Sequence, residues 1–448
     1  MPLTLRDRLR LFIHIPFVRG VATFQVGTVV MTITGFVSSV AYARLLGLHE
    51  FGIYAAVTAF AGLLGLFTSY GQETATITFL SEAVGRRDKK SIALVLRYFL
   101  QATSLSTLVY IALFLLAPVI AVAVGSDPRI GMLARLVLLN AVLQPVNVLL
   151  FIALQLQRRI ALVAFLENAL DIIQLVLAVI LLLLGWGVAG ILLAQLTGML
   201  AAVPLFLFLY TRSARAQGFP TLYESVSRLH TSGTGPYARQ GLWIALDRSI
   251  SGNLYPNLFF VLLNATTTPA TVGVFRIALR LATLPLSLLM PSITRMTAVS
   301  IPRIAAVDPK HLLRSCRRVL AGAVGLSLLA TIGAAIVAPP LIPLVYGAEF
   351  ARVIPIFLLI LPINIISSMH VVTVPILRVL RRVWAITLTN GGGIVLAMGL
   401  YFLLVRTLPA LPSVGLSVLF FHTFSLLLFV YVWFLYRHRK GVSLNTHD

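Results

Sequence analysis

Long apolar runs separated by short polar breaks make up most of this chain. A run of about 20 apolar residues is typical of a helix that crosses a bilayer. Twelve runs predict membrane-spanning helices, at residues 21–44, 51–80, 92–124, 131–156, 160–184, 188–210, 239–264, 270–297, 316–338, 351–376, 383–405 and 413–436. The breaks are too short to hold a folded domain outside the membrane. The pattern therefore predicts an all-α, polytopic membrane protein with twelve transmembrane helices.

Composition agrees with this pattern and excludes several classes of protein. Of the 448 residues, 59% are apolar and 11% are charged, whereas soluble domains carry about 25% charged residues. The single cysteine, Cys316, excludes an intramolecular disulfide, an iron–sulfur cluster and a cysteine-based zinc site. We expect no cofactor, no metal and no catalytic residue. A cleaved secretory signal is the alternative for the first run, but that run is longer than a signal peptide needs, and eleven more spans follow.

The basic residues are distributed unevenly over the loops. The chain has 35 Lys and Arg against 13 Asp and Glu, and 24 of the 35 lie at the two termini or in every second loop. Cytoplasmic loops carry such an excess, so both termini are predicted to be cytoplasmic. A basic excess is also typical of nucleic-acid binding, but no hydrophilic domain exists to carry that function. We therefore expect membrane lipids, and no nucleic acid, as partners.

The two halves of the chain form a weak internal repeat. A shift of 221 residues places Gly52-Ile53-Tyr54 on Gly273-Val274-Phe275, and a shift of 223 residues places Glu167 on Asn390. Six helices separate the copies, so the copies have the same orientation, as in transporters built from parallel repeats. This predicts an N-terminal six-helix lobe at 1–210, a cytoplasmic linker at 211–237 and a C-terminal six-helix lobe at 238–448. A substrate cleft is expected between the lobes.

Charged residues inside the predicted spans are candidates for function, because each costs roughly 2.5–3.5 kcal/mol at the bilayer centre. In the second lobe these residues are Asp247, Arg248, Arg276 and Arg280. Arg276 and Arg280 are one helical turn apart, at depths of about 9 and 15 Å from the outer surface. Three arginines near one acid favour binding of an anion in a cavity. The alternative is a structural ion pair, in which Asp247 neutralises one arginine.

Acids in the first lobe form a second candidate site. Glu167 and Asp171 lie one turn apart in the span 160–184, about 10 and 16 Å from its cytoplasmic end. They predict either a coupling-cation or proton site, or salt bridges to arginines of the other lobe. Glu73 is predicted to be interfacial.

Other polar residues in the spans have simpler interpretations. His370, Asn364 and Asn390 are expected to form interhelical hydrogen bonds. The first span is rich in Ser and Thr, whose hydroxyls can bond their own backbone. This span is nevertheless a natural wall for a cleft.

Several motifs resemble a known family. They are Ala43-Arg44-Leu45-Leu46-Gly47-x-x-x-Phe51-Gly52-Ile53-Tyr54, Phe79-Leu80-Ser81-Glu82-Ala83, Val272-Gly273-Val274-Phe275-Arg276-x-Ala278-x-Arg280-Leu281-Ala282 and Leu344-Val345-Tyr346-Gly347-Ala348-Glu349-Phe350. Together they resemble the polysaccharide transporter (oligosaccharide flippase) branch of the multidrug/oligosaccharidyl-lipid/polysaccharide exporter superfamily. The likeness covers about residues 20–405.

The resemblance implies a V-shaped fold of two six-helix lobes that works by alternating access in the bacterial inner membrane. It implies export of undecaprenyl-pyrophosphate-linked oligosaccharide for surface polysaccharide or O-antigen, with a polysaccharide polymerase as an expected partner. It also implies that cavity arginines meet the pyrophosphate, which fits Arg248, Arg276 and Arg280. Related lipid II flippases usually have two further helices for the lipid tail, which this chain has no residues to form.

Two other functions are alternatives to a flippase. A cation-coupled multidrug antiporter of the same fold would need acids in its cleft, whereas arginines prevail here. A membrane-embedded glycosyltransferase or polymerase would need acids on large outer loops, and these loops are short. No metal or nucleotide motif occurs, so we expect a transporter rather than an enzyme.

Overall fold

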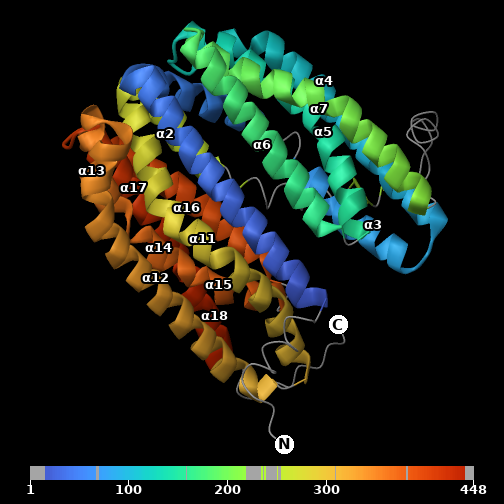
Figure 1. The fold of residues 1–448 in the computed structure, drawn as a ribbon. Coiled ribbons are helices and arrows are strands. Elements are labelled where there is room, and N and C mark those ends of the chain that lie inside the picture. Colours follow the sequence, from blue (N-terminus) through green and yellow to red (C-terminus); the bar gives the residue numbers. More distant parts are fainter. Residues whose placement is uncertain are drawn as a thin grey trace, which may run out of the picture. The chain divides into compact units, whose positions relative to one another are not determined.

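All regular elements in the described part of the chain are helices (Figure 1). The computed structural model describes residues 16–66, 70–157, 159–217, 234–235, 237–238, 250, 254–307, 309–379 and 382–438. The chain divides into two compact units, Met1–Gly273 and Val274–Asp448, named unit 1 and unit 2 below. The lobes at 1–210 and 238–448 remain a prediction.

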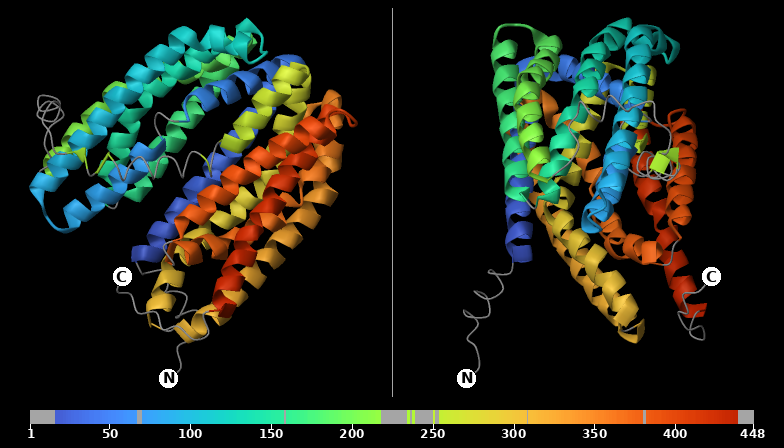
Figure 2. Two further views of the ribbon diagram at one scale, coloured as in Figure 1. Left: turned by 180° about the vertical axis from the view of Figure 1, so that it is seen from behind. Right: turned by 90° about the vertical axis from the view of Figure 1, so that its right-hand side faces the viewer.

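Unit 1 is a bundle of long helices. Its helices are α2 (Pro16–Leu64), α3 (Tyr70–Gly85), α4 (Lys89–Ala123), α5 (Pro128–Leu156), α6 (Ile160–Leu183), α7 (Gly187–Gln217) and α10 (Tyr255–Thr266). Helix α5 packs between α4 and α7, and α6 packs against both α7 and α2 (Figure 2). Aromatic and aliphatic side chains fill the centre of this bundle, among them Phe79, Phe99, Leu150 and Phe206.

Helix α2 contains the predicted span 21–44 and the first part of the span 51–80, with a kink between them at Gly47. This residue has φ 71° and ψ 170°, a left-handed conformation that glycine adopts at little cost. Just beyond it, the Glu50 carboxylate accepts two hydrogen bonds of 3.0 Å from the Arg129 guanidinium at the start of α5. This bidentate pair joins the bend of α2 to α5.

The backbone approaches itself very closely one turn further on. A Cβ atom on Gly52 would lie 1.7 Å from the carbonyl oxygen of Pro269. A Cβ atom on Gly273 would lie 3.2 Å from Gly52 Cα. Side chains at these positions would force the two segments apart, so glycine is a packing requirement here.

A proline in α4 explains a charge within the membrane span of α5. Pro118 has no N–H to donate to the carbonyl of Phe114, four residues earlier. Arg135 of α5 donates from Nε to that carbonyl at 2.9 Å, and from an Nη atom to the Leu115 carbonyl at 3.2 Å. Its guanidinium also lies over the Phe114 ring. Arg135 therefore has a structural role at the proline.

Aspartates cap the starts of α4 and α5. Asp88 accepts hydrogen bonds from the hydroxyl and amide of Ser91 and from the amide of Lys90, and these bonds hold the pKa of its carboxyl below the usual range. Asp127 accepts from the amide of Arg129, with Pro128 at the first helical position. Both arrangements satisfy amides that a helix leaves unpaired at its N-terminus.

Unit 2 contains one strongly broken span. Its helices are α11 (Pro269–Val307, which begins at the end of unit 1), α12 (Pro309–Tyr346), η2 (Ala348–Arg352), α13 (Val353–Ile360), α14 (Ile363–Ser368), α15 (His370–Val379), α16 (Val383–Leu404), α17 (Ala410–Ser425) and α18 (Leu427–His438). The predicted span 351–376 consists of α13, α14 and α15, and the helices on either side of Leu361-Pro362 are bent by 44°. The buried Cys316 belongs to an apolar cluster with Leu377, Ile386 and Leu428.

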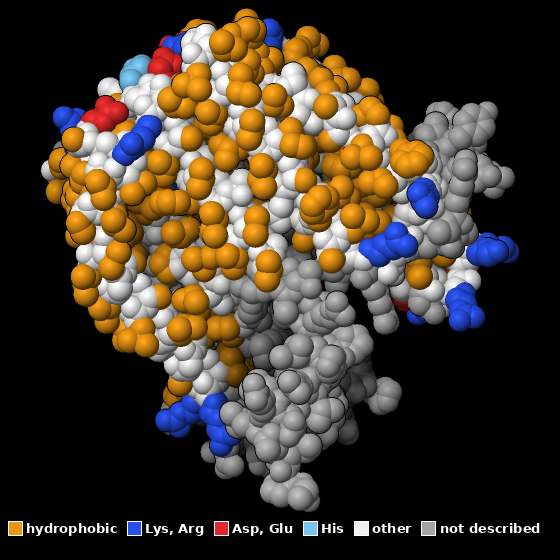
Figure 3. All heavy atoms as spheres, viewed as in Figure 1, with side chains coloured by type: hydrophobic (Ala, Val, Ile, Leu, Met, Phe, Trp, Pro, Cys, Tyr) orange, Lys and Arg blue, Asp and Glu red, His pale blue; other side chains and the backbone are white. Residues whose placement is uncertain are grey.

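The structure supports a multi-pass membrane protein. Nine helices of the described residues are long and apolar enough to cross a bilayer, and the bent pair gives a tenth. Large apolar side chains remain exposed along them, as Leu183 (70%) and Leu329 (70%) illustrate, and apolar side chains cover most of the described surface in Figure 3. Such a surface suits lipid rather than water. The count of twelve stays a prediction, because the span 51–80 is divided between α2 and α3 and most of 239–253 lies outside the described residues.

Candidate functional site

Two of the predicted arginines share one face of α11. Arg276 is half-buried and Arg280 is exposed, one turn further along the helix. Residues 274–448 contain only three acids, Asp308, Glu349 and Asp448, and all of them lie outside the predicted spans. Among the described residues, no acid forms an ion pair with Arg280. The arginine Arg248 and its neighbour Asp247 lie outside the described residues.

The predicted acids of α6 lie within unit 1. Glu167 and Asp171 are both half-buried on α6. Glu73 of α3 and Asp171 are each close enough to Glu167 to interact with it electrostatically. Asp171 is similarly close to Tyr42 of α2. Two helices, α3 and α6, therefore place Glu73, Glu167 and Asp171 close enough to interact, and these three residues are named the acidic cluster below.

The acidic cluster has few polar partners. No described Lys, Arg or His forms an ion pair with Glu73, Glu167 or Asp171; the two ion pairs seen are Glu82–Arg86 and Glu50–Arg129. Within the described ranges, no group of three or more His, Cys, Asp and Glu side chains could hold a metal ion. Half-buried carboxyl groups can exchange a proton or attract a single cation. Both this role and the alternative, salt bridges to arginines of the other predicted lobe, stay predictions.

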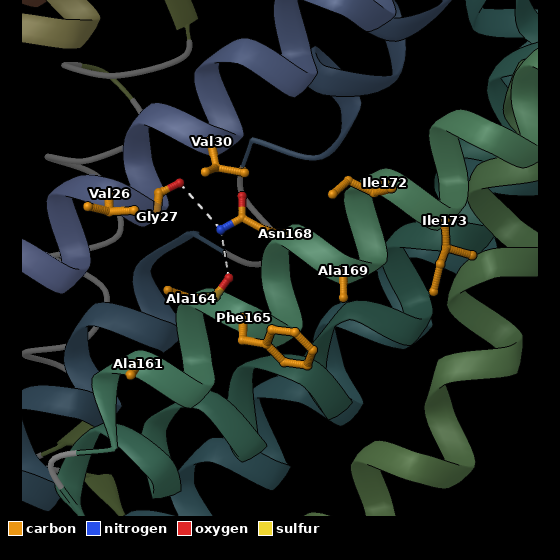
Figure 4. A pocket seen from close by; sticks show the side chains of 10 residues that line it. All are labelled: Val26, Gly27, Val30, Ala161, Ala164, Phe165, Asn168, Ala169, Ile172 and Ile173. Carbon is orange, nitrogen blue, oxygen red and sulfur yellow. Dashed lines mark hydrogen bonds between the residues drawn. The ribbon is translucent and has the colours of Figure 1, made fainter.

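Asn168, between the two acids in sequence, faces a groove. Its amide nitrogen donates to the carbonyls of Ala164 at 2.7 Å and Gly27 at 3.3 Å, which ties α6 to α2 (Figure 4). The groove beside it has a volume of about 550 Å³. Sequence reasoning missed this groove, because the small residues that form it, such as Ala161 and Ala169, are inconspicuous in an apolar run.

Interhelical hydrogen bonds confirm two of three predictions in unit 2. His370 Nε2 lies 2.7 Å from Ser425 Oγ, and the Asn364 amide donates to the Ala282 carbonyl at 2.6 Å. His422, which sequence reasoning did not single out, makes a matching contact of 3.2 Å from Nδ1 to Ser367 Oγ. The third residue, Asn390, makes no hydrogen bond with a described residue of another helix.

Two hydroxyls of the first span, those of Thr32 and Ser38, are satisfied locally. Thr32 donates to the Thr28 carbonyl and Ser38 to the Thr34 carbonyl, each at 2.8 Å. They therefore need no ligand to balance their burial.

Comparison with known structures identifies the fold. A multidrug resistance MATE family transporter of the MOP superfamily, in an inward-facing conformation, matches with a TM-score of 0.71 over 91% of this chain and 95% of that one, at 16% identity. A MATE transporter from Vibrio cholerae matches with a TM-score of 0.61 over 95% and 97% of the two chains, at 14% identity. No curated protein matches the sequence significantly.

The helices, the apolar surface and these matches define a multi-pass membrane protein with the fold seen in MATE transporters. The family model described as polysaccharide biosynthesis protein matches residues 17–307. The chain therefore belongs to the polysaccharide biosynthesis protein family. This bears out the likeness seen in the motifs around Gly52 and Gly273.

Proposed function

We propose that this protein flips lipid-linked oligosaccharide repeat units across the bacterial inner membrane by alternating access. The cargo is the undecaprenyl-pyrophosphate-linked kind used for surface polysaccharide or O-antigen. The two predicted lobes, 1–210 and 238–448, would open in turn to either side, with both termini in the cytoplasm. The protein would act as a transporter and not as an enzyme, next to a polymerase that consumes its product.

The pair Arg276 and Arg280 carries this proposal. A guanidinium keeps its charge at any physiological pH and binds phosphate oxygens bidentately. Two such groups one turn apart suit the two phosphates of a pyrophosphate. Membership of the polysaccharide biosynthesis family supports the same cargo. Arg248 would be a third contact.

The acidic cluster favours a second candidate function, a cation-coupled multidrug antiporter. Glu73, Glu167 and Asp171 could attract a cationic drug, and the matched solved structures are MATE transporters. In the flippase the same acids would instead take the coupling proton or sodium ion. No observation favours a glycosyltransferase or polymerase.

One reconstitution experiment separates the two candidates. The full-length protein is placed in vesicles with a fluorescent pyrophosphate-linked oligosaccharide lipid, and exposure of the sugar to an external glycosidase is followed. We expect the sugar to move between leaflets only in vesicles that contain the protein. Movement of a cationic dye under a proton or sodium gradient, with no movement of the sugar, would establish the antiporter and overturn the flippase.

A further inference from the structure

The groove between α2 and α6 is lined almost entirely by apolar residues, with Asn168 as the one polar side chain. Ten residues line it, and none is charged: Val26, Gly27, Val30, Ala161, Ala164, Phe165, Asn168, Ala169, Ile172 and Ile173. Its volume of about 550 Å³ falls within the usual range of about 300–1,000 Å³ for ligand pockets. Phe165 and Ile173 stand exposed along its rim (Figure 4). A hydrocarbon is the ligand that such a surface accepts.

The small residues of the two helices make the groove a fixed feature. A Cβ atom on Gly27 would lie 2.8 Å from the Ala164 Cβ, so the helices touch there. The amide of Asn168 bonds to the carbonyls of both residues. Larger lining residues, such as Val30 and Phe165, flank this contact, and the groove is the space between the two helices beside it.

The α6 wall of the groove has about the length of one leaflet. Its lining on α6 runs from Ala161 to Ile173, which is about 18 Å at the helical rise. Half of the hydrocarbon core is about 15 Å. With the predicted topology, α6 begins at the cytoplasmic side, so the groove lies in the cytoplasmic leaflet.

A cation stands at the cytoplasmic end of the groove. Arg159 is the residue before α6 and is exposed, and its side chain makes no capping hydrogen bond. It lies two residues before Ala161, at the level where a lipid headgroup meets the hydrocarbon. A lipid could place its anionic headgroup against the Arg159 guanidinium and its hydrocarbon chain in the apolar groove.

We propose that the α2–α6 groove binds the hydrocarbon chain of a polyisoprenoid phosphate lipid, with the phosphate against Arg159. The identity of the lipid rests on the proposed function, since the cargo's long chain must stay in apolar surroundings while its headgroup crosses. Each exposed CH₂ group would otherwise cost about 0.8 kcal/mol. The groove holds the chain in the cytoplasmic leaflet before translocation.

Photo-crosslinking tests this site in the full-length protein. Vesicles contain either a polyprenyl phosphate or a phosphatidylglycerol with a diazirine in the chain, and labelled peptides are identified by mass spectrometry. We expect the polyprenyl probe to label the α2 and α6 lining residues in preference to the phosphatidylglycerol probe. Ala169→Phe fills the groove and should reduce this labelling about tenfold. Val176→Phe adds the same ring at an exposed position of α6 outside the groove and should leave labelling unchanged.

Three outcomes would overturn the inference: no labelling of the groove, equal labelling by both probes, or unchanged labelling in Ala169→Phe. Equal labelling would mean a general contact with bilayer lipid. The flipping assay distinguishes a failure of the groove proposal from a failure of the proposed flippase function. If the wild type flips the saccharide lipid and Ala169→Phe retains full activity and labelling, only the groove is wrong. If the polyprenyl probe labels the groove but the wild type flips nothing, the proposed function is wrong.

Discussion

Helices α6 of unit 1 and α16 of unit 2 occupy equivalent places in the internal repeat but carry different chemistry. The offset of 223 residues pairs Glu167 with Asn390 and Asp171 with Ile394. The two acids are half-buried in unit 1, whereas Ile394 is buried in the apolar interior of unit 2. The helix of the second copy that corresponds to α6 therefore carries no acid.

The arginines show the opposite distribution. The offset of 221 residues pairs Arg276 with Ala55 and Arg280 with Ala59. Both alanines are fully buried in unit 1, where an arginine side chain could not be accommodated. The second copy thus has arginines at positions where the first copy has closely packed alanines. The first copy has acids on α6 at positions where the second copy has an asparagine and an isoleucine.

Residues that the two copies share have a packing role instead. Gly52 and Gly273 are equivalent in the repeat, and they pack against each other at the bend of α2. The glycine that is present in both copies allows helices to pack closely, whereas these arginines and acids are each present in only one copy. This comparison predicts that shared positions control stability and unshared charges control transport.

The largest effect should follow from removing the arginines. Replacing Arg276 and Arg280 together by Ala reproduces the residues of the first copy. Hydrogen bonds to charged groups contribute about 1.5–3 kcal/mol each, so we expect saccharide-lipid flipping in vesicles to fall about a hundredfold or more. Lys at both positions keeps the charge but loses the bidentate geometry, and should give an intermediate rate. Arg317→Ala, an exposed arginine of α12, is the control; full activity of the double Ala variant would refute the role of the pair.

A shared position should affect stability instead. Gly52→Val places a side chain onto the Pro269 carbonyl and should destabilise the protein by about 1–3 kcal/mol, as overpacking does. The lowered midpoint of thermal unfolding in detergent measures this loss. Gly333→Ala on α12, where a Cβ atom meets nothing within 4 Å, should be neutral or slightly stabilising. Equal midpoints for Gly52→Val and the wild type would show that the contact is dispensable.

The smallest effect should concern coupling. Glu167→Gln or Glu167→Asn, the second of which copies Asn390, removes a charge from the acidic cluster. We expect flipping to continue at a rate reduced by about tenfold or less and to lose its response to an imposed proton or sodium gradient. Glu82→Gln removes an exposed acid of the same unit and should keep the response. An unaltered gradient response in both Glu167 variants would leave the cluster without a coupling role.

The sequence was sufficient to predict the all-α class, the approximate spans and several of the charged residues within them. Apolar length and the sidedness of Lys and Arg are one-dimensional properties, because each span must bury its own backbone hydrogen bonds in lipid. The charges of α6 and α11 stand out for the same reason, since few charged residues occur within membrane spans.

Only the tertiary structure shows which helices these residues share and what they contact. Arg135 looks like another intramembrane charge until the Phe114 carbonyl, freed by Pro118, appears beside it. Glu73 comes within electrostatic range of Glu167 only in the folded chain, and the α2–α6 groove exists only because Gly27 and Ala164 let two helices touch. Hydropathy determines that a helix crosses the membrane, but close packing of side chains determines its neighbours, and many apolar sequences satisfy the first requirement equally well.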